Sequence, residues 1–212
     1  MLNIKKSLMD DSQIPGPYLE HLKDIYADMD RAYTRATVYY GFGCRGCLDS
    51  CCRTLFYHHT VLEYLYLIKG WAGLTQEQQL ETAGLAVSVC RQMPAALAGH
   101  GPVRLMCPLN LDGLCLLYSR RPMICRLHGI PHELHAPGQP VHHGTGCDAF
   151  TAQCGAKEYF RFDRTPYYVR MARLEKDLRK SMGISGKLKM TVAQMINENA
   201  RFYLAKRDAV TE

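Results

Sequence analysis

Apolar side chains recur at helical spacing near the start of the chain. Over residues 17–36 they form one stripe with charged side chains between them, which is the pattern of an amphipathic helix. A Pro-Gly-Pro sequence at residues 15–17 marks the beginning of this stripe. We therefore expect an N-terminal packing helix over residues 15–40. The stripe consists of Leu19, Leu22, Ile25, Tyr26, Met29, Tyr33 and Ala36.

Two capping signals predict further helices in the middle of the chain. Residues 60–63 have the spacing of a capping box, and the segment up to Gly70 is apolar on nearly all faces, which indicates a buried helix. Residues 75–78 repeat the signal, and the helix that follows passes through Cys90. We expect Pro94 to end or kink that helix, and we expect Cys90 to belong to its apolar face.

The C-terminal quarter is also periodic, and we expect a helical extension over residues 160–212. Thr165 and Pro166 make a suitable N-cap and first helical position, and Gly183 is a suitable stop. Residues 191–194 then have the spacing of another capping box before a last helix. Residues 157–189 carry ten Lys or Arg against four acids. A charged outer helix face explains this excess more simply than a surface for nucleic acid or an acidic partner.

Residues 99–155 show no sustained period and are rich in Gly and Pro. A long irregular segment inside a compact protein needs more than packing to hold it. This segment contains Cys107, Cys115, Cys125 and Cys147, and metal bonds to these cysteines would restrain it.

The densest chemical signal lies just before, where four cysteines fall within residues 44–52. The Cys-x-x-Cys step from Cys44 to Cys47 lets two thiolates reach one metal from a tight turn. Cys51 and Cys52 are adjacent, so their side chains point in different directions. They more naturally serve two metals, or two corners of one cluster. We therefore predict a cysteine-cluster metal-binding core over residues 41–155.

Composition decides how the ten cysteines are interpreted. The 212-residue chain has 47% hydrophobic and 22% charged residues, which favours a globular protein, and we expect one domain over residues 1–212. It has neither a signal-peptide pattern nor an apolar run of about 18 residues, so we expect a cytoplasmic protein without membrane partners. In a reducing compartment metal binding is a better explanation than disulfides. Eight metal-bound thiolates with two zinc ions, or two [4Fe–4S] clusters, would bring the net charge from +6 to about +2.

Eight cysteines stand in contexts suited to metal binding, twice the four ligands that a tetrahedral zinc or a [4Fe–4S] cluster takes from protein. Their order resembles the zinc- or iron-chelating family named for its CxxCxxCC signature, over roughly residues 44–147. The resemblance implies that the eight act together as a metal site. Three residues instead of two separate Cys47 from Cys51, a departure from that signature. The predicted metal ligands are Cys44, Cys47, Cys51, Cys52, Cys107, Cys115, Cys125 and Cys147.

Arginines and histidines near these cysteines are further candidates. Arg121 and Arg126 flank Cys125, and each could donate to sulfur or offset thiolate charge, or simply be exposed. Five histidines follow, and they indicate either a mixed Cys/His or open catalytic metal site or, preferably, a solvated loop. They are His128, His132, His135, His142 and His143.

We therefore predict a mainly α-helical fold, with helices packed around an irregular cysteine-rich metal-binding lobe. The leading hypothesis is an iron–sulfur protein, used in electron transfer with a redox or protein partner or as the cofactor of a reaction. The second is a zinc protein whose Cys₄ sites are structural and which acts as an interaction module. Only one Cys-x-x-Cys step is present, where two zinc knuckles usually have paired steps. A third hypothesis is a methylase, because flagellin lysine methylases share the signature, although the chain lacks a Gly-rich cofactor loop.

Overall fold

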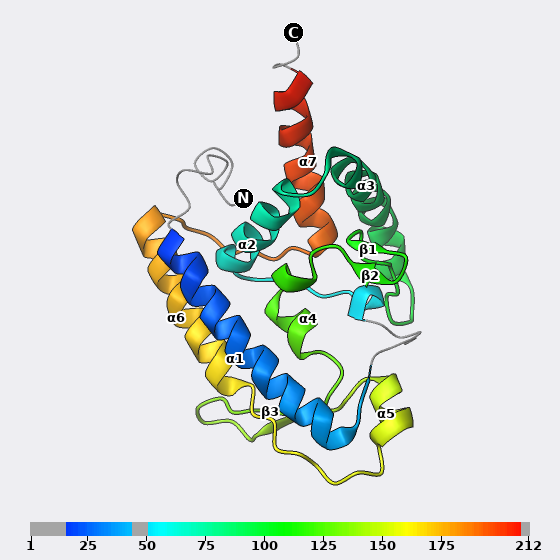
Figure 1. The fold of residues 1–212 in the computed structure, drawn as a ribbon, viewed down its shortest axis with the longest axis vertical. Coiled ribbons are helices and arrows are strands. Elements are labelled where there is room, and N and C mark those ends of the chain that lie inside the picture. The colour runs from blue at the N-terminus through cyan, green and yellow to red at the C-terminus, as the bar shows by residue number, and fades with distance from the viewer. Residues whose placement is uncertain (1–15, 44–50, 209–212) are drawn as a thin grey trace. The chain divides into compact units, whose positions relative to one another are not determined.

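The structure of the protein is a computed structural model that describes residues 16–43 and 51–208, with side chains up to residue 200. Helices make up most of this part of the chain, and its strands form only two short antiparallel pairs (Figure 1). The prediction of a mainly α-helical fold is confirmed. The helices are α1 (Gly16–Tyr40), α2 (Val61–Ala72), α3 (Gln76–Ala98), α4 (Met123–Leu127), α5 (Asp148–Cys154), α6 (Thr165–Met182) and α7 (Val192–Asp208).

The chain divides into two compact units. One falls within Pro15–Cys51 and Met123–Ile184 and contains α1, α4, α5 and α6; we call it the α1–α6 unit. The other falls within Cys52–Pro122 and Ser185–Glu212 and contains α2, α3 and α7; we call it the α3–α7 unit. A short 3₁₀ turn, η2 (Cys51–Arg53), lies where the first stretch of one unit meets the other.

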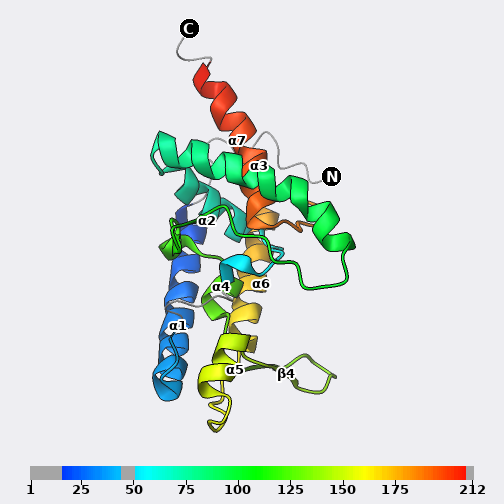
Figure 2. The same ribbon diagram turned by 90° about the vertical axis from the view of Figure 1, so that its right-hand side faces the viewer.

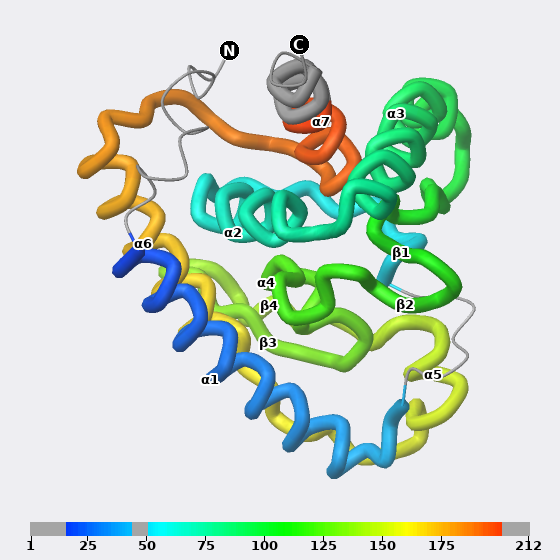
Figure 3. The backbone as a smooth tube through the Cα atoms, turned by 45° about the horizontal axis from the view of Figure 1, so that its top comes forward, coloured from blue at the N-terminus to red at the C-terminus, as the bar shows by residue number. Residues whose placement is uncertain are grey.

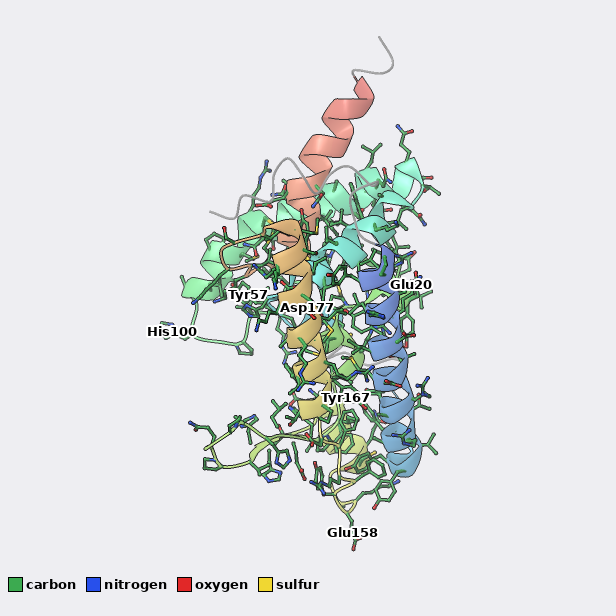
Figure 4. All side chains as sticks on the ribbon, turned by 90° about the vertical axis from the view of Figure 1, so that its left-hand side faces the viewer. Glu20, Tyr57, His100, Glu158, Tyr167 and Asp177 are labelled. Carbon is green, nitrogen blue, oxygen red and sulfur yellow. The ribbon has the colours of Figure 1, made fainter. Side chains whose placement is uncertain are left out.

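In the α1–α6 unit, α6 runs antiparallel along α1 (Figures 1 and 3). The predicted stripe of α1 is buried, and Leu22 and Met29 are fully covered. Near the middle of α1, Asp28 accepts from the Arg170 guanidinium at 2.5 Å. At its beginning, the Tyr18 hydroxyl donates to the carbonyl of Asp177, whose position on α6 is marked in Figure 4. Part of the basic excess of α6 is therefore used in packing against α1.

The C-terminal end of α1 is closed by groups from the segment around α5. The Lys157 ammonium donates to the Tyr40 carbonyl at 2.6 Å, and the buried Cys154 thiol donates to the same oxygen at 3.3 Å. A cation is favourable here because the carbonyls at a helix C-terminus carry partial negative charge. Gly41, with φ +61°, then turns the chain out of the helix. Cys154 thus has a structural role at this helix end.

A small hairpin projects from the α1–α6 unit (Figure 2). Its strands are β3 (His132–Leu134) and β4 (His142–Gly144), paired so that Glu133 lies opposite His143. The backbone of Glu133 also makes two hydrogen bonds to the extended segment before α6. Its N–H donates to the Phe162 carbonyl, and its carbonyl accepts from the Arg164 N–H. These bonds fix the start of α6 against β3.

The N-cap of α6 corrects one sequence-based prediction. The structure places Arg164 at the N-cap and Thr165 inside the helix. The Thr165 hydroxyl accepts from the His135 N–H at 2.7 Å, while the Thr165 N–H donates to the Asp163 carboxylate at 2.8 Å. Asp163 therefore satisfies a free N–H group at this helix end, and Thr165 is used to hold the hairpin.

In the α3–α7 unit, α2 is buried on nearly all faces, and both predicted capping residues, Thr60 and Thr75, accept a backbone N–H. The fully buried Trp71 indole donates to Thr82 at 2.9 Å. The helix α3 continues through Pro94 to Ala98, so the proline does not end it. Good helix formers follow the proline and favour another turn. No helix among the described residues is long and apolar enough to cross a membrane.

Candidate metal centre

A tight hairpin in the α3–α7 unit presents two of the predicted ligands. Its strands are β1 (Asn110–Leu111) and β2 (Leu114–Cys115), and Asn110 pairs with Cys115. The turn uses positive φ at Asp112 (+50°) and Gly113 (+81°), the conformation of the tight hairpin turns that favour Asp-Gly. Cys107 lies just before the first strand and Cys115 ends the second, so the hairpin brings them to the same end.

Cys52 reaches the same place from a distant part of the sequence. Its carbonyl accepts the Cys107 N–H at 2.6 Å. The three thiols lie within electrostatic range of one another, since charge on Cys52 or Cys115 would raise the pKa of the Cys107 thiol. Cys52 has the same effect on the pKa of Cys115. We call Cys52, Cys107 and Cys115 the thiol triad.

Two sulfurs of the triad accept hydrogen bonds from the backbone. The Leu109 N–H donates to the Cys107 sulfur and the Leu117 N–H to the Cys115 sulfur, and both bonds lower the thiol pKa. In each case the donor is two residues after the cysteine. Pro108 has no N–H, so Leu109 is the first residue after Cys107 that can donate. Bonds of this kind stabilise a thiolate relative to a thiol.

Burial acts in the opposite direction and is the stronger effect. It raises the pKa of the Cys107 thiol from an ordinary 9.0 to about 12, and it also raises the pKa of Cys115. Without a compensating cation Cys107 and Cys115 are therefore protonated at neutral pH. A metal ion bound by these thiols would supply that compensation, because a coordinated thiol is deprotonated.

Arg121 lies where a positive charge acts on the triad. Its guanidinium lowers the pKa of Cys115, although less than burial raises it. The side chain is held by the short turn η3 (Tyr118–Arg120), since its Nε donates to the Tyr118 carbonyl at 3.0 Å and its guanidinium stacks 3.6 Å from the centre of the Tyr118 ring. Arg121 thus has the position that its predicted role requires, and the role itself stays a prediction.

Arg126 has different surroundings, in the α1–α6 unit. Its side chain is almost fully buried, donates to Asp30 at 2.5 Å and lies over the Tyr26 ring at 4.1 Å from the ring centre. Both partners belong to α1. These contacts anchor α4 on α1, and the predicted electrostatic role of Arg126 toward a thiolate stays a prediction.

The two remaining described ligands of the irregular segment also belong to the α1–α6 unit. Cys125 lies in α4, and Cys147 is the N-cap residue of α5. The Cys147 N–H donates to the Gly129 carbonyl at 3.1 Å. Gly129 has φ +104°, and a Cβ added there would lie 3.6 Å from the Cys147 sulfur. The turn after α4 therefore packs directly against one of the predicted ligands.

The remaining predicted ligands are the cysteines of residues 44–51, and the structure describes only one of them. Cys44 and Cys47 lie outside the described residues, and Cys51 begins η2. The cysteines of the described ranges are thiols and not disulfides. Within residues 16–43 and 51–208, no three His, Cys, Asp or Glu side chains are placed so that they could hold a metal ion as they stand. The complete ligand set stays a prediction.

Four of the five candidate histidines lie in or beside the β3–β4 hairpin. His135 bonds to the Glu133 carboxylate at 3.0 Å, and His142 and His143 are exposed on β4. Burial, with smaller contributions from the charges of Arg164 and His142, lowers the pKa of His132 to about 4. His132 is therefore neutral at pH 7.

The sequence-based reasoning missed the N–H groups of Leu109 and Leu117, which donate to sulfur. It also missed the buried guanidinium of Arg164, which donates to the carbonyls of Leu127 and Ile130. The Cys-Pro-Leu sequence at residues 107–109 contained a signal for the first, since proline leaves the third residue as the nearest donor. Arg164 gave no signal, because an arginine before a helix is usually exposed.

Comparisons with known proteins add no assignment: no family model, no curated protein and no solved structure matches the chain. The family resemblance of the cysteine pattern therefore stays a prediction. The function must be inferred from the residues themselves.

Proposed function

We propose that the protein binds a metal centre through cysteine thiolates, and that this centre is an iron–sulfur cluster used in electron transfer or as the cofactor of a reaction. The observation that supports the proposal is the thiol triad. Three cysteines from two distant stretches lie within electrostatic range of one another in one unit, two of their sulfurs accept backbone N–H groups, and the charge of Arg121 acts on one of them.

The donor set fits soft metal centres. Thiolates favour iron–sulfur clusters, zinc and Cu(I) over hard cations such as magnesium. Cys52, Cys107 and Cys115 would contribute to the centre, and the remaining predicted ligands would complete the set. When bound, an iron–sulfur cluster supplies a site that takes up and releases single electrons, and hydrogen bonds to its sulfurs help to set its potential. The N–H groups of Leu109 and Leu117 are suited to that task.

The test begins with anaerobically purified protein. A brown colour, absorbance near 400 nm and acid-labile sulfide are expected of an iron–sulfur protein. Colourless protein with stoichiometric zinc would support the second hypothesis, a structural zinc protein that acts as an interaction module. Protein that holds neither metal after purification and reconstitution would refute both.

Matched variants identify the ligands. Cys107→Ser and Cys115→Ser are expected to lose metal, because serine is a poor ligand for soft metals. Cys90→Ser and Cys154→Ser are the controls, since Cys90 lies on α3 and Cys154 bonds to the end of α1. Cys51→Ser should also lose metal and expose residues 99–155 to proteases. Equal metal content in all five variants would contradict the ligand assignment.

A further inference from the structure

The turn at the end of α4, residues 127–130, has a hydrogen bond on each of its four carbonyls. The Tyr33 hydroxyl donates to the His128 carbonyl at 2.7 Å, and the Cys147 N–H donates to the Gly129 carbonyl at 3.1 Å. The guanidinium Nη2 of Arg164 donates to the carbonyls at both ends of the turn, those of Leu127 and Ile130. One side chain therefore joins the beginning and the end of the turn.

Arg164 is an unusual residue for this position, because it is only 3% exposed. None of its bonds within the described chain is to a carboxylate, and its Nε has no hydrogen-bond partner there. The titratable groups around it are the phenols of Tyr33, Tyr159 and Tyr168 and the imidazole of His132. Burial lowers the pKa of Arg164 to about 10, so the guanidinium remains charged at pH 7.

A buried charge without an ionic partner is costly unless polar groups replace its water. The carbonyls of Leu127 and Ile130 do this for Arg164. The dependence is mutual, since buried carbonyls also need donors. The backbone of Arg164 is itself fixed, because its N–H donates to Glu133 and its carbonyl accepts from Tyr167 at the start of α6. Arg164 therefore connects a rigid helix end to the turn.

We propose that Arg164 is a positioning residue for Cys147, one of the predicted metal ligands. It holds the 127–130 turn in the shape that places the Gly129 carbonyl under the Cys147 N–H and the Gly129 Cα beside the Cys147 sulfur. The same turn continues from the helix that carries Cys125. The metal-related part of this inference rests on the proposed function, whereas the placement of the thiol does not.

The experiment measures alkylation of individual cysteines in the folded, metal-free protein, with iodoacetamide and peptide mass spectrometry. Arg164→Gln removes the charge and shortens the side chain, so that its amide cannot reach both carbonyls, and it should speed alkylation of Cys147 about tenfold, because the turn then opens more often. Cys107 and Cys115, which belong to the other unit, should keep their rates. Arg164→Lys keeps a charged donor and should give an intermediate rate for Cys147.

The matched control is Arg161→Gln, which removes an equal charge from the exposed side chain that pairs with Glu133. It should leave Cys147 unchanged. An unchanged Cys147 rate in Arg164→Gln would overturn the proposal, and so would an equal rise at all cysteines, which indicates general loss of stability. If Arg164→Gln does not fold, the selective effect must appear in Arg164→Lys, and its absence there has the same consequence.

Metal binding is measured in parallel on the loaded protein, as the rate of metal loss to a chelator. Arg164→Gln should lose metal faster than Arg161→Gln. Wild-type protein that binds neither iron nor zinc would refute the proposed function, while the alkylation rates would still decide the role of Arg164.

Discussion

The protonation of Cys107 gives the sharpest test of the thiol triad. Its pKa of about 12 predicts a thiolate fraction of about 10⁻⁴ at pH 8, against about one tenth for a thiol with the ordinary value of 9.0. Alkylating agents react with the thiolate. Cys107 in the folded, metal-free protein should therefore react about 1000-fold more slowly at pH 8 than in the urea-denatured chain.

The assay is the rate of iodoacetamide labelling at Cys107 as a function of pH, measured peptide by peptide. Slow diffusion into a buried site would lower the rate at every pH, whereas a raised pKa also moves the pH at which the rate levels off. The labelling rate of the folded protein should keep rising up to the limit of its stability range in alkali. A rate that levels off near pH 9 would refute the placement of this thiol.

Three further consequences follow from the same pKa. Burial is its largest cause, so Cys52→Ser should lower the pKa of Cys107 only slightly. Between pH 9 and 12 the unfolded chain releases this proton before the folded protein does. The free energy of unfolding of the metal-free protein should therefore fall as pH rises through that range. At neutral pH, metal binding should release protons into the buffer.

The remaining predictions concern stability, measured by urea denaturation. Asp30→Asn removes the ionic partner of buried Arg126 and should cost about 1 kcal/mol, because Asp30 is itself half-exposed. Thr82→Val leaves the buried Trp71 indole N–H without its acceptor and should cost about 1–3 kcal/mol. Gly129→Ala forces alanine to φ +104° beside Cys147 and should cost about 1–3 kcal/mol.

Each of these variants has a matched control. Asp24→Asn, on an exposed position of α1, should stay within about 0.5 kcal/mol of wild type. Thr82→Ser keeps the acceptor and should recover much of the loss. Gly84→Ala, in α3 with no atom within 4 Å of the added Cβ, should stabilise by about 0.5–1 kcal/mol. Losses in these controls as large as in the variants would contradict the assigned contacts.

The helices of this protein were predictable because their signals are local. The stripe of α1 needs only the spacing of Leu22, Met29 and their neighbours, and the caps at Thr60 and Thr75 need only three residues each. Thr165 shows the limit of local reasoning. Its hydroxyl has two acceptable uses, and the choice between capping α6 and holding the hairpin depends on where His135 lies.

The three cysteines of the thiol triad were among the predicted metal ligands, but the groups that surround them were not predicted. Cys107 and Cys115 were predicted as ligands because they lie in the irregular segment of residues 99–155, which needs more than packing to hold it. The pKa of each thiol depends on its burial and on which backbone N–H donates to its sulfur. Burial in turn is set by contacts between residues far apart in the sequence. Cys154 and Cys107 illustrate the difference, because both are thiols in the same composition. The first donates to the end of a helix, whereas the second accepts an N–H and lies within electrostatic range of two other thiols.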